Sequence, residues 1–185
     1  MAGPVFTFNH DSSVNDFAVS KASYLVAHPD SAFGYIATST LVMHTRIPFL
    51  PRVLLVQRAA DDEDPNLWEA PGGACDDDDE SILHAAAREL YEEAGLEVEK
   101  FEGVVGEQWF FTLDDGKKVC QFTFGAKVKG DNGVTDLKVR LDPKEHQRFL
   151  WATAQEVREK KVGEVDLEFT SEVVERNVLA AFGKQ

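Results

Sequence analysis

One short segment constrains the fold of this chain more than any other, because it has the pattern of an amphipathic helix with a marked end. Apolar side chains recur along residues 83 to 94 at helical spacing, and Gly95 follows them. A helix advances by about 100° per residue, so Glu89, Glu92 and Glu93 project from one side of it, away from the apolar stripe. The segment therefore predicts a helix that packs on a core and presents three carboxylates.

Three acids on one helix face have two interpretations. They occur as solvated surface residues, since like charges at these spacings destabilise an exposed helix by roughly a few tenths of a kcal/mol. They also serve as metal ligands, because Mg²⁺ and Mn²⁺ prefer carboxylate oxygens and commonly share their coordination with substrate phosphates. From the acids alone, solvated surface residues are the expected interpretation.

The residues around the acids form a longer pattern. A Pro-Gly-Gly turn ending at Gly73 precedes the helix, Glu80 lies just before it, and Arg88 stands beside the acids. Together they resemble the Nudix box, G-x5-E-x7-R-E-U-x-E-E-x-G-U, in which U is aliphatic. The match is complete from Glu80 to Leu96, whereas the spacer between Gly73 and Glu80 is one residue longer than the box allows.

This resemblance implies both a fold and a reaction. The implied fold is the Nudix fold of the α/β class, a mixed β-sheet sandwiched between α-helices. The implied reaction is metal-dependent hydrolysis of a pyrophosphate linkage in a nucleoside diphosphate joined to another group, X. Glu89, Glu92 and Glu93 are then the expected ligands of Mg²⁺ or Mn²⁺, and a backbone carbonyl of Gly72 or Gly73 completes the set.

Two further residues receive catalytic roles. Arg88 carries a forked guanidinium suited to holding a neighbouring carboxylate, and Glu80 is the expected partner. Glu145, just ahead of a strand that contains Trp151, resembles the general base that some relatives place before such a strand. The alternative for Glu145 is an ordinary exposed loop glutamate.

The histidines and cysteines suggest no site of their own. His44, His84 and His146 lack the spacing of a metal pair, so we expect them to be structural or exposed, and only His146 is near the suspected site. Cys75 and Cys120 form no paired ligand spacing and are expected to be free thiols in a reducing compartment.

The approach to the box suggests the substrate. Residues 67 to 73 are similar to the same stretch in relatives that remove oxidised nucleoside triphosphates. We expect Arg58, Trp68, Gly72 and Gly73 to contact the substrate, with a nucleoside triphosphate or related small nucleotide as the first hypothesis. Dinucleoside polyphosphates, nucleotide sugars, diphosphoinositols and isoprenyl diphosphates are alternatives. A Nudix module that binds a nucleotide without hydrolysing it is a further one.

Four aromatic residues have two interpretations each. They either stack on a nucleotide base or fill the core, and core packing is expected for at least two of them. They are Trp68, Trp109, Phe110 and Phe111.

Length and charge bound the rest. The 185 residues suit one domain, residues 21 to 185, preceded by an N-terminal arm, residues 1 to 20, for which partial disorder is the alternative. The net charge of −14 disfavours long nucleic acid as a partner and leaves small phosphorylated substrates. The N-terminus lacks the pattern of a secretory signal, and no stretch has the length and apolarity of a membrane span. We therefore expect a cytoplasmic protein without a membrane partner, and a homodimer is compatible with the sequence.

Patterns outside the box predict mainly strands. Apolar runs place strands at residues 35 to 44, 52 to 58, 104 to 112, 119 to 128 and 148 to 151. An Asp-Gly pair ending at Gly116 predicts a hairpin between two of them. Thr153 and Glu156 form a capping box for a short helix, and residues 171 to 182 have the spacing of a terminal helix.

Overall fold

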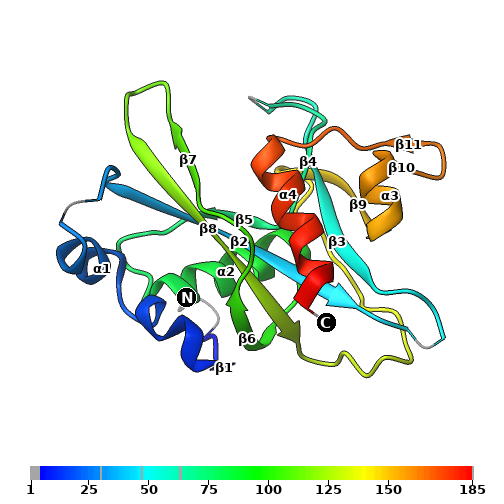
Figure 1. Ribbon diagram of the computed structural model, residues 1–185, viewed down its shortest axis with the longest axis horizontal. Coiled ribbons are helices and arrows are strands. Elements are labelled where there is room, and N and C mark those ends of the chain that lie inside the picture. The colour runs from blue at the N-terminus through cyan, green and yellow to red at the C-terminus, as the bar shows by residue number, and fades with distance from the viewer. Residues whose placement is uncertain (1–4, 30, 47, 63, 185) are drawn as a thin grey trace.

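A mixed β-sheet forms the centre of the molecule (Figure 1). The computed structural model describes residues 5–29, 31–46, 48–62 and 64–184. The strands are β1 (Asn9–His10), β2 (Tyr35–His44), β3 (Arg52–Arg58), β4 (Trp68–Glu69), β5 (Gly72–Ala74), β6 (Val98–Val104), β7 (Trp109–Thr112), β8 (Lys118–Val128), β9 (His146–Thr153), β10 (Lys161–Val162) and β11 (Val165–Asp166). The helices are α1 (Lys21–Ala27), α2 (Ile82–Ala94), α3 (Ala154–Glu159) and α4 (Glu172–Ala181), with 3-10 helices η1 (Ser12–Phe17) and η2 (Phe182–Lys184).

The Pro-Gly-Gly segment lies where strands β2 and β3 are not paired with each other. The main path through the sheet is β1-β6-β8-β2-β3-β4, with β2 and β8 parallel over eight registered pairs. Strands β2 and β3 pair only near their ends, through Met43 with Val53 and His44 with Arg52. Strand β5 pairs instead with the first half of β2, and β9 runs antiparallel to β3. Segments that are far apart in sequence therefore meet where β2 and β3 diverge.

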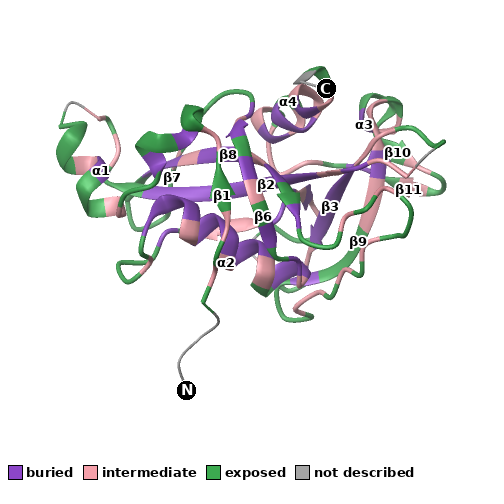
Figure 2. Ribbon diagram, turned by 90° about the horizontal axis from the view of Figure 1, so that it is seen from below, coloured by how far each residue is buried: buried purple, intermediate pink, exposed green. Residues whose placement is uncertain are grey.

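Helices cover both faces of this sheet, and each face has its own core (Figure 2). Successive strand side chains point to opposite faces. Leu54 accordingly packs with α2 and the N-terminal segment, while its neighbours Val53 and Leu55 pack in the core that contains residues of α3 and α4. The predicted arrangement of a mixed sheet between helices is confirmed.

Most elements predicted from sequence patterns are present. The strands at residues 35–44 and 52–58 have the expected bounds, the Thr153 capping box forms, and Ser171 caps the terminal helix. The hairpin between β7 and β8 turns at Gly116, whose φ is 84°. The single strand expected at residues 104 to 112 is wrong. The chain breaks there into β6 and β7 near Gly106, whose φ of 68° does not fit a strand.

The N-terminal segment lies against helix α2 and the sheet. Strand β1 pairs in parallel with β6, and Val14 and Phe17 are buried in the core that contains α2. The carbonyl of Val19 accepts a hydrogen bond of 3.0 Å from the Ile82 amide, the first residue of α2. The first four residues of the predicted arm lie outside the described residues.

No helix among the described residues combines the length and apolarity needed to cross a membrane. Both cysteines are buried free thiols, as predicted. Burial raises the pKa of Cys75 and of Cys120 to about 12, so both remain protonated at neutral pH.

Candidate active site

Helix α2 holds the acidic face rigidly because both of its ends are capped and one side is fully buried. The Ser81 hydroxyl accepts a hydrogen bond from the His84 amide at the N-terminus. Gly95 ends the helix in the left-handed region with φ of 67°, which glycine adopts without strain. Leu83 and Leu90 on the apolar stripe are completely buried. The glutamates beside that stripe therefore have a fixed position.

Arg88 binds several acids, but not the one expected. Its Nε and Nη2 donate to both carboxylate oxygens of Asp79, at 3.0 and 2.9 Å. Its Nη1 donates to Glu89 at 2.8 Å and to Glu92 at 3.1 Å. The predicted pairing with Glu80 is wrong, because the Glu80 side chain is 82% exposed and lies 3.5 Å from the His84 ring. These hydrogen bonds, led by those to Asp79, raise the Arg88 pKa, so the guanidinium stays charged.

The Asp79 contact also changes where the one-residue insertion lies relative to the Nudix pattern. Five residues separate Gly73 from Asp79, which is the spacing the family pattern gives between its glycine and its acid. Asp79 therefore takes the place of that acid in space, and the additional residue falls between Asp79 and Arg88. The Asp76 amide donates to Asp79 Oδ2 at 2.8 Å, which closes the loop so that Asp79 faces Arg88.

The three glutamates of the helix differ in environment. Glu89 and Glu93 are buried, whereas the Glu92 side chain is 53% exposed. Burial raises the pKa of Glu89 to about 7 despite the neighbouring Arg88. Burial also raises the pKa of Glu93, although the Gly72 amide donates to its Oε2 at 2.8 Å. Desolvation therefore outweighs the nearby Arg88 at Glu89, while Glu93 is hydrogen-bonded by a backbone amide rather than by a cation.

The Pro-Gly-Gly segment touches these acids because its glycines have no side chains. A Cβ at Gly73 would lie 2.7 Å from the Glu89 carboxyl carbon, and one at Gly72 would overlap the Thr38 backbone. The main chain of β5 thus approaches the carboxylates more closely than any other residue type permits.

These donors fit a hard divalent cation. The set consists of carboxylate oxygens at Glu89, Glu92 and Glu93, with the backbone of Gly73 against Glu89. Mg²⁺ and Mn²⁺ take such ligands. A bound cation would also offset the negative charge that the two buried glutamates carry when they are ionised.

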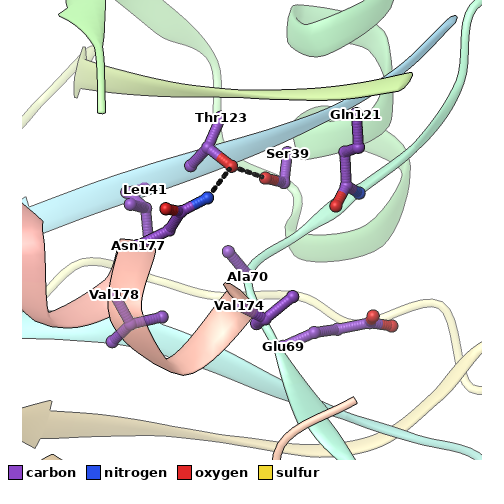
Figure 3. A pocket seen from close by; sticks show the side chains of 9 residues that line it. All are labelled: Ser39, Leu41, Glu69, Ala70, Gln121, Thr123, Val174, Asn177 and Val178. Carbon is purple, nitrogen blue, oxygen red and sulfur yellow. Dashed lines mark hydrogen bonds between the residues drawn. The ribbon is translucent and has the colours of Figure 1, made fainter. Parts of the chain in front are cut away.

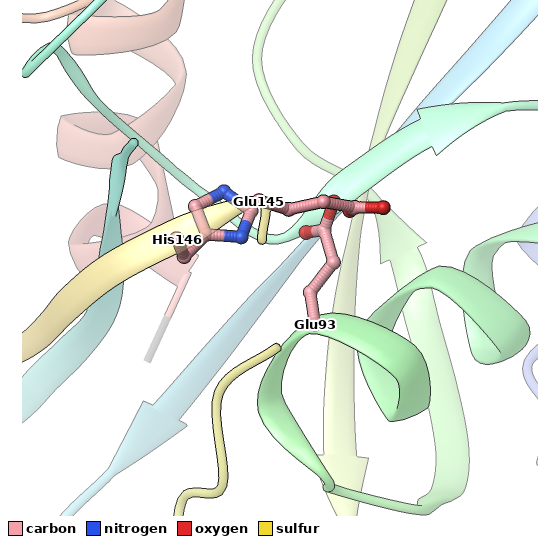
Figure 4. A group of neighbouring side chains, drawn as sticks. All are labelled: Glu93, Glu145 and His146. Carbon is pink, nitrogen blue, oxygen red and sulfur yellow. The ribbon is translucent and has the colours of Figure 1, made fainter. Parts of the chain in front are cut away.

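Glu145, just before β9, and His146, the first residue of β9, lie beside the same acids. A carboxylate oxygen of Glu93, one of Glu145 and a ring nitrogen of His146 lie within 4.8 Å of one another (Figure 4). Glu145 is exposed and His146 is 4% exposed. Among the histidines considered, the sequence placed only His146 near the site, and the structure brings its buried ring beside Glu93 and Glu145. Strand pairing creates this position, since Arg58 of β3 pairs with His146 across a register shift.

A cleft of about 770 Å³ opens beside the acids, a volume that suits a small ligand. Its lining includes Gly72 and Gly73 together with Trp109 and Phe111, whose rings are 4.7 Å apart. Phe110 alternates to the other side of β7 and is exposed. Two of the four aromatic residues with an open role therefore face the cleft.

Two residues expected at the substrate are already engaged in protein contacts. Trp68 is 1% exposed and its indole donates to the Asp166 carbonyl, so the structure places it in the core. Arg58 lines the cleft, but its guanidinium donates to Asp62 at 2.6 Å and to Glu69 at 2.9 Å. The sequence did not suggest Glu69, which is near His146 only because β4 and β9 both pair with β3.

A second hollow is too small for a substrate. It has a volume of about 10 Å³, enough for roughly one water molecule (Figure 3). Asn177 of α4 donates to the Thr123 hydroxyl at 3.2 Å, and that hydroxyl is 2.9 Å from the Ser39 hydroxyl. This buried network fixes α4 to β8 and β2 beneath the cleft.

Comparisons with known proteins agree with this geometry. The family model of the NUDIX domain matches residues 43–173. The CTP pyrophosphohydrolase of Escherichia coli (strain K12) is 29% identical over 116 residues, which cover 63% of this chain and 77% of that protein. The MutT protein from Methanosarcina mazei Go1 superposes with a TM-score of 0.57 at 23% identity, over 81% of this chain and 93% of that one. The C. elegans Ap4A hydrolase gives a TM-score of 0.53 at 23% identity, over 68% and 84%.

An acidic helix against a glycine segment, in a mixed sheet between helices, defines the Nudix class of hydrolases, and the chain belongs to the NUDIX family. The fold predicted from the box is thus confirmed. The protein is an enzyme that hydrolyses pyrophosphate linkages.

Proposed function

We propose that the enzyme hydrolyses a nucleoside triphosphate or a related small nucleotide with Mg²⁺ or Mn²⁺ as the cofactor. The observation that carries the proposal is the glycine segment, which lines a cleft with two aromatic rings and packs directly against the buried Glu89 carboxylate. The same cleft therefore combines groups suited to phosphates with groups suited to a base.

Glu89, Glu92 and Glu93 are proposed to hold the cation, together with the Gly73 carbonyl. A divalent cation there would offset the negative charge of the pyrophosphate and lower the pKa of a water molecule. Arg88 does not contact the substrate in this proposal. It fixes the orientation of Glu89 and Glu92 through the hydrogen bonds described above.

Glu145 is proposed as the general base. Its exposed carboxylate lies near Glu93, so it can accept a proton from a water molecule that attacks phosphorus. The proton would move from that water to a Glu145 carboxylate oxygen as the oxygen–phosphorus bond forms. The bridging oxygen of the pyrophosphate would leave with the departing phosphate group.

The nucleoside is proposed to lie on Trp109 and Phe111. Aromatic rings of this kind stack on any base, because every base has a π-face. Trp68, which the sequence also suggested, is replaced here because of its burial. Arg58 is placed at the cleft wall, where its bonds to Asp62 and Glu69 let it shape the pocket more than bind phosphate.

The relatives support a nucleotide and rank the candidates. The E. coli relative is named for CTP, which makes a pyrimidine nucleoside triphosphate the first substrate to assay. The C. elegans structure is that of an Ap4A hydrolase, which keeps dinucleoside polyphosphates second. The two buried free thiols support the predicted reducing, cytoplasmic compartment.

The test is a substrate panel assayed for release of phosphate or pyrophosphate with Mg²⁺ and with Mn²⁺. Turnover of a nucleoside triphosphate that disappears in Glu92→Gln supports the proposal. Full activity in Glu92→Gln contradicts the metal assignment. Absence of turnover on every nucleotide, with nucleotide binding retained, contradicts the enzymatic function proposed for this cleft.

A further inference from the structure

One of the buried polar atoms that lack a partner among the described residues is a histidine nitrogen next to the site. His146 is 4% exposed, and its Nδ1 is buried with no hydrogen-bond partner among the residues that the structure describes. A buried polar atom left in this state costs about 1–3 kcal/mol, so it calls for a physical reason. A ligand that binds the nitrogen would provide that reason.

The surroundings of the ring favour a cation as that ligand. A ring nitrogen of His146 and carboxylate oxygens of Glu93 and Glu145 lie within 4.8 Å of one another. Figure 4 shows one ring nitrogen turned toward the Glu93 carboxylate, with the Glu145 side chain beside it. Two ligand atoms on opposite sides of an ion, each with a bond of about 2.1 Å, are about 4.2 Å apart. Small side-chain rotations would therefore bring all three ligand atoms to bonding distance of one ion.

The other side of the ring supports the same assignment. His146 Nε2 lies 3.7 Å from Glu69 Oε1, and Glu69 is held at 2.9 Å by Arg58. A carboxylate beside one imidazole nitrogen favours the proton there and leaves a lone pair on the other nitrogen. Metal-bound histidines commonly have such a carboxylate partner. Arg58 and Glu69 therefore act as positioning residues for His146.

We infer that His146 Nδ1, with one carboxylate oxygen each of Glu93 and Glu145, forms a mixed nitrogen and oxygen site for a first-row transition ion such as Mn²⁺. The second Glu145 oxygen stays available as the proposed proton acceptor. The ligands expected from the box are all oxygens, so the histidine nitrogen distinguishes this chain's own site. Imidazole nitrogen shifts preference from Mg²⁺ toward transition ions. The role of this site in catalysis rests on the proposed metal-dependent function, whereas the experiment that tests it measures metal binding alone.

The test detects the metal–nitrogen bond directly. Tag-free full-length protein receives one and then two equivalents of Mn²⁺ in a buffer free of nitrogen ligands, and pulsed electron paramagnetic resonance records nuclear modulation. Wild-type protein is expected to show ¹⁴N modulation from a directly bound imidazole. Protein labelled with ¹⁵N-histidine is expected to show the ¹⁵N pattern instead, which tests the bond without any substitution.

A variant pair assigns the nitrogen. His146→Gln should lose the ¹⁴N modulation and bind Mn²⁺ at least about tenfold more weakly, with a smaller change for Mg²⁺. His84→Gln, which alters a partly exposed histidine on α2, should keep both signals. Wild-type protein that binds Mn²⁺ without nitrogen modulation overturns the inference, as does modulation that persists in His146→Gln. If the protein hydrolyses a nucleotide but shows no nitrogen coupling, only the inference about His146 is contradicted. If it shows nitrogen coupling but hydrolyses no nucleotide, the inference about His146 is supported and the proposed function is contradicted.

Discussion

The two halves of the site are built in different ways. On one side, Glu89, Glu92 and Glu93 share a helix whose spacing alone brings them together. On the other side, Glu145 and His146 reach the same place through the pairing of β9 with β3. The helix half depends on local geometry, and the strand half depends on the register of distant segments.

The difference has a chemical consequence. The helix half offers oxygen ligands and one guanidinium that holds them, whereas the strand half adds an exposed carboxylate and an imidazole. The first half suits any hard cation, and the second half adjusts the choice of ion and the handling of the proton. We therefore expect substitutions in the two halves to have different effects on activity and on metal binding.

The largest effect is expected when a buried acid of the helix half is neutralised. Glu93→Gln should lower kcat/KM by at least about a hundredfold, because a charge at the reacting centre is lost. Its side-chain carbonyl can still accept the Gly72 hydrogen bond, so the fold should persist. Steady-state kinetics and circular dichroism check both statements.

The matched change in the strand half tests whether the halves share the chemistry. Glu145→Gln should also lower kcat, within the range of about 10²- to 10⁴-fold that a general base contributes. Glu99→Gln, an exposed glutamate on β6, serves as the control and should leave the rate unchanged. Full activity in Glu145→Gln would restrict the chemistry to the helix half.

The next effect concerns the residue that holds the helix half. Asp79→Asn should lower activity by about 10- to 100-fold, because Arg88 loses its bidentate partner and the ligands lose their orientation. Glu80→Gln should stay within about twofold, since surface pairs contribute roughly 0–1 kcal/mol. Kinetics of this pair decide which acid serves Arg88, and the reverse ranking would contradict the structure.

The sequence predicted the helix half well because its information is local. The spacing of the three acids and the end at Gly95 are properties of one helix, and α2 has both. The partner of Arg88 was missed because Asp79 and Glu80 are adjacent in sequence. The loop hydrogen bond from the Asp76 amide to Asp79 selects between them, and no residue spacing encodes that bond.

The strand half was predicted less completely for a physical reason. Glu145 was found from its place before a strand, whereas His146 and Glu69 meet only after β4 and β9 have paired with β3. A register shift at Gln57 and Arg58 sets which β9 residue lies opposite them. Such a shift has no periodic signature. Burial of Trp68 likewise follows from tertiary packing rather than from its place beside the box.

A smaller effect is expected in the stability of the metal-free protein. Burial raises the pKa of Glu89 from 4.5 to about 7, so the folded chain keeps a proton that the unfolded chain releases. This contribution to the free energy of unfolding is complete below about pH 4.5 and is lost as the pH rises through about 7. The Tm measured with a chelator should therefore fall by several degrees more between pH 5 and 8 in wild-type protein than in Glu89→Gln.

Metal ions provide the control for this pH profile. Mg²⁺ binds the folded state through ionised carboxylates, so it should raise Tm more at pH 8 than at pH 5. If Tm changes equally with pH in wild-type protein and in Glu89→Gln, protonation of the buried acid does not contribute to the stability of the fold.

The smallest effect is expected from one hydrogen-bonding side chain that supports the strand half. Gln147 Nε2 donates to the Arg58 carbonyl at 2.9 Å and to the Asn66 side chain at 2.8 Å, which ties the start of β9 to the end of β3. Loss of a neutral hydrogen bond costs about 1 kcal/mol, so Gln147→Ala should lower kcat/KM by no more than about fivefold. Lys144→Ala, an exposed change in the turn just before β9, should have no effect. Because Gln147 supports only the strand half, the fall should appear alongside weaker Mn²⁺ binding, while Mg²⁺ binding stays the same. An equal loss of affinity for Mn²⁺ and Mg²⁺ would mean that the helix half and the strand half bind metal as one site. The two halves would then differ only in how the sequence brings their residues together.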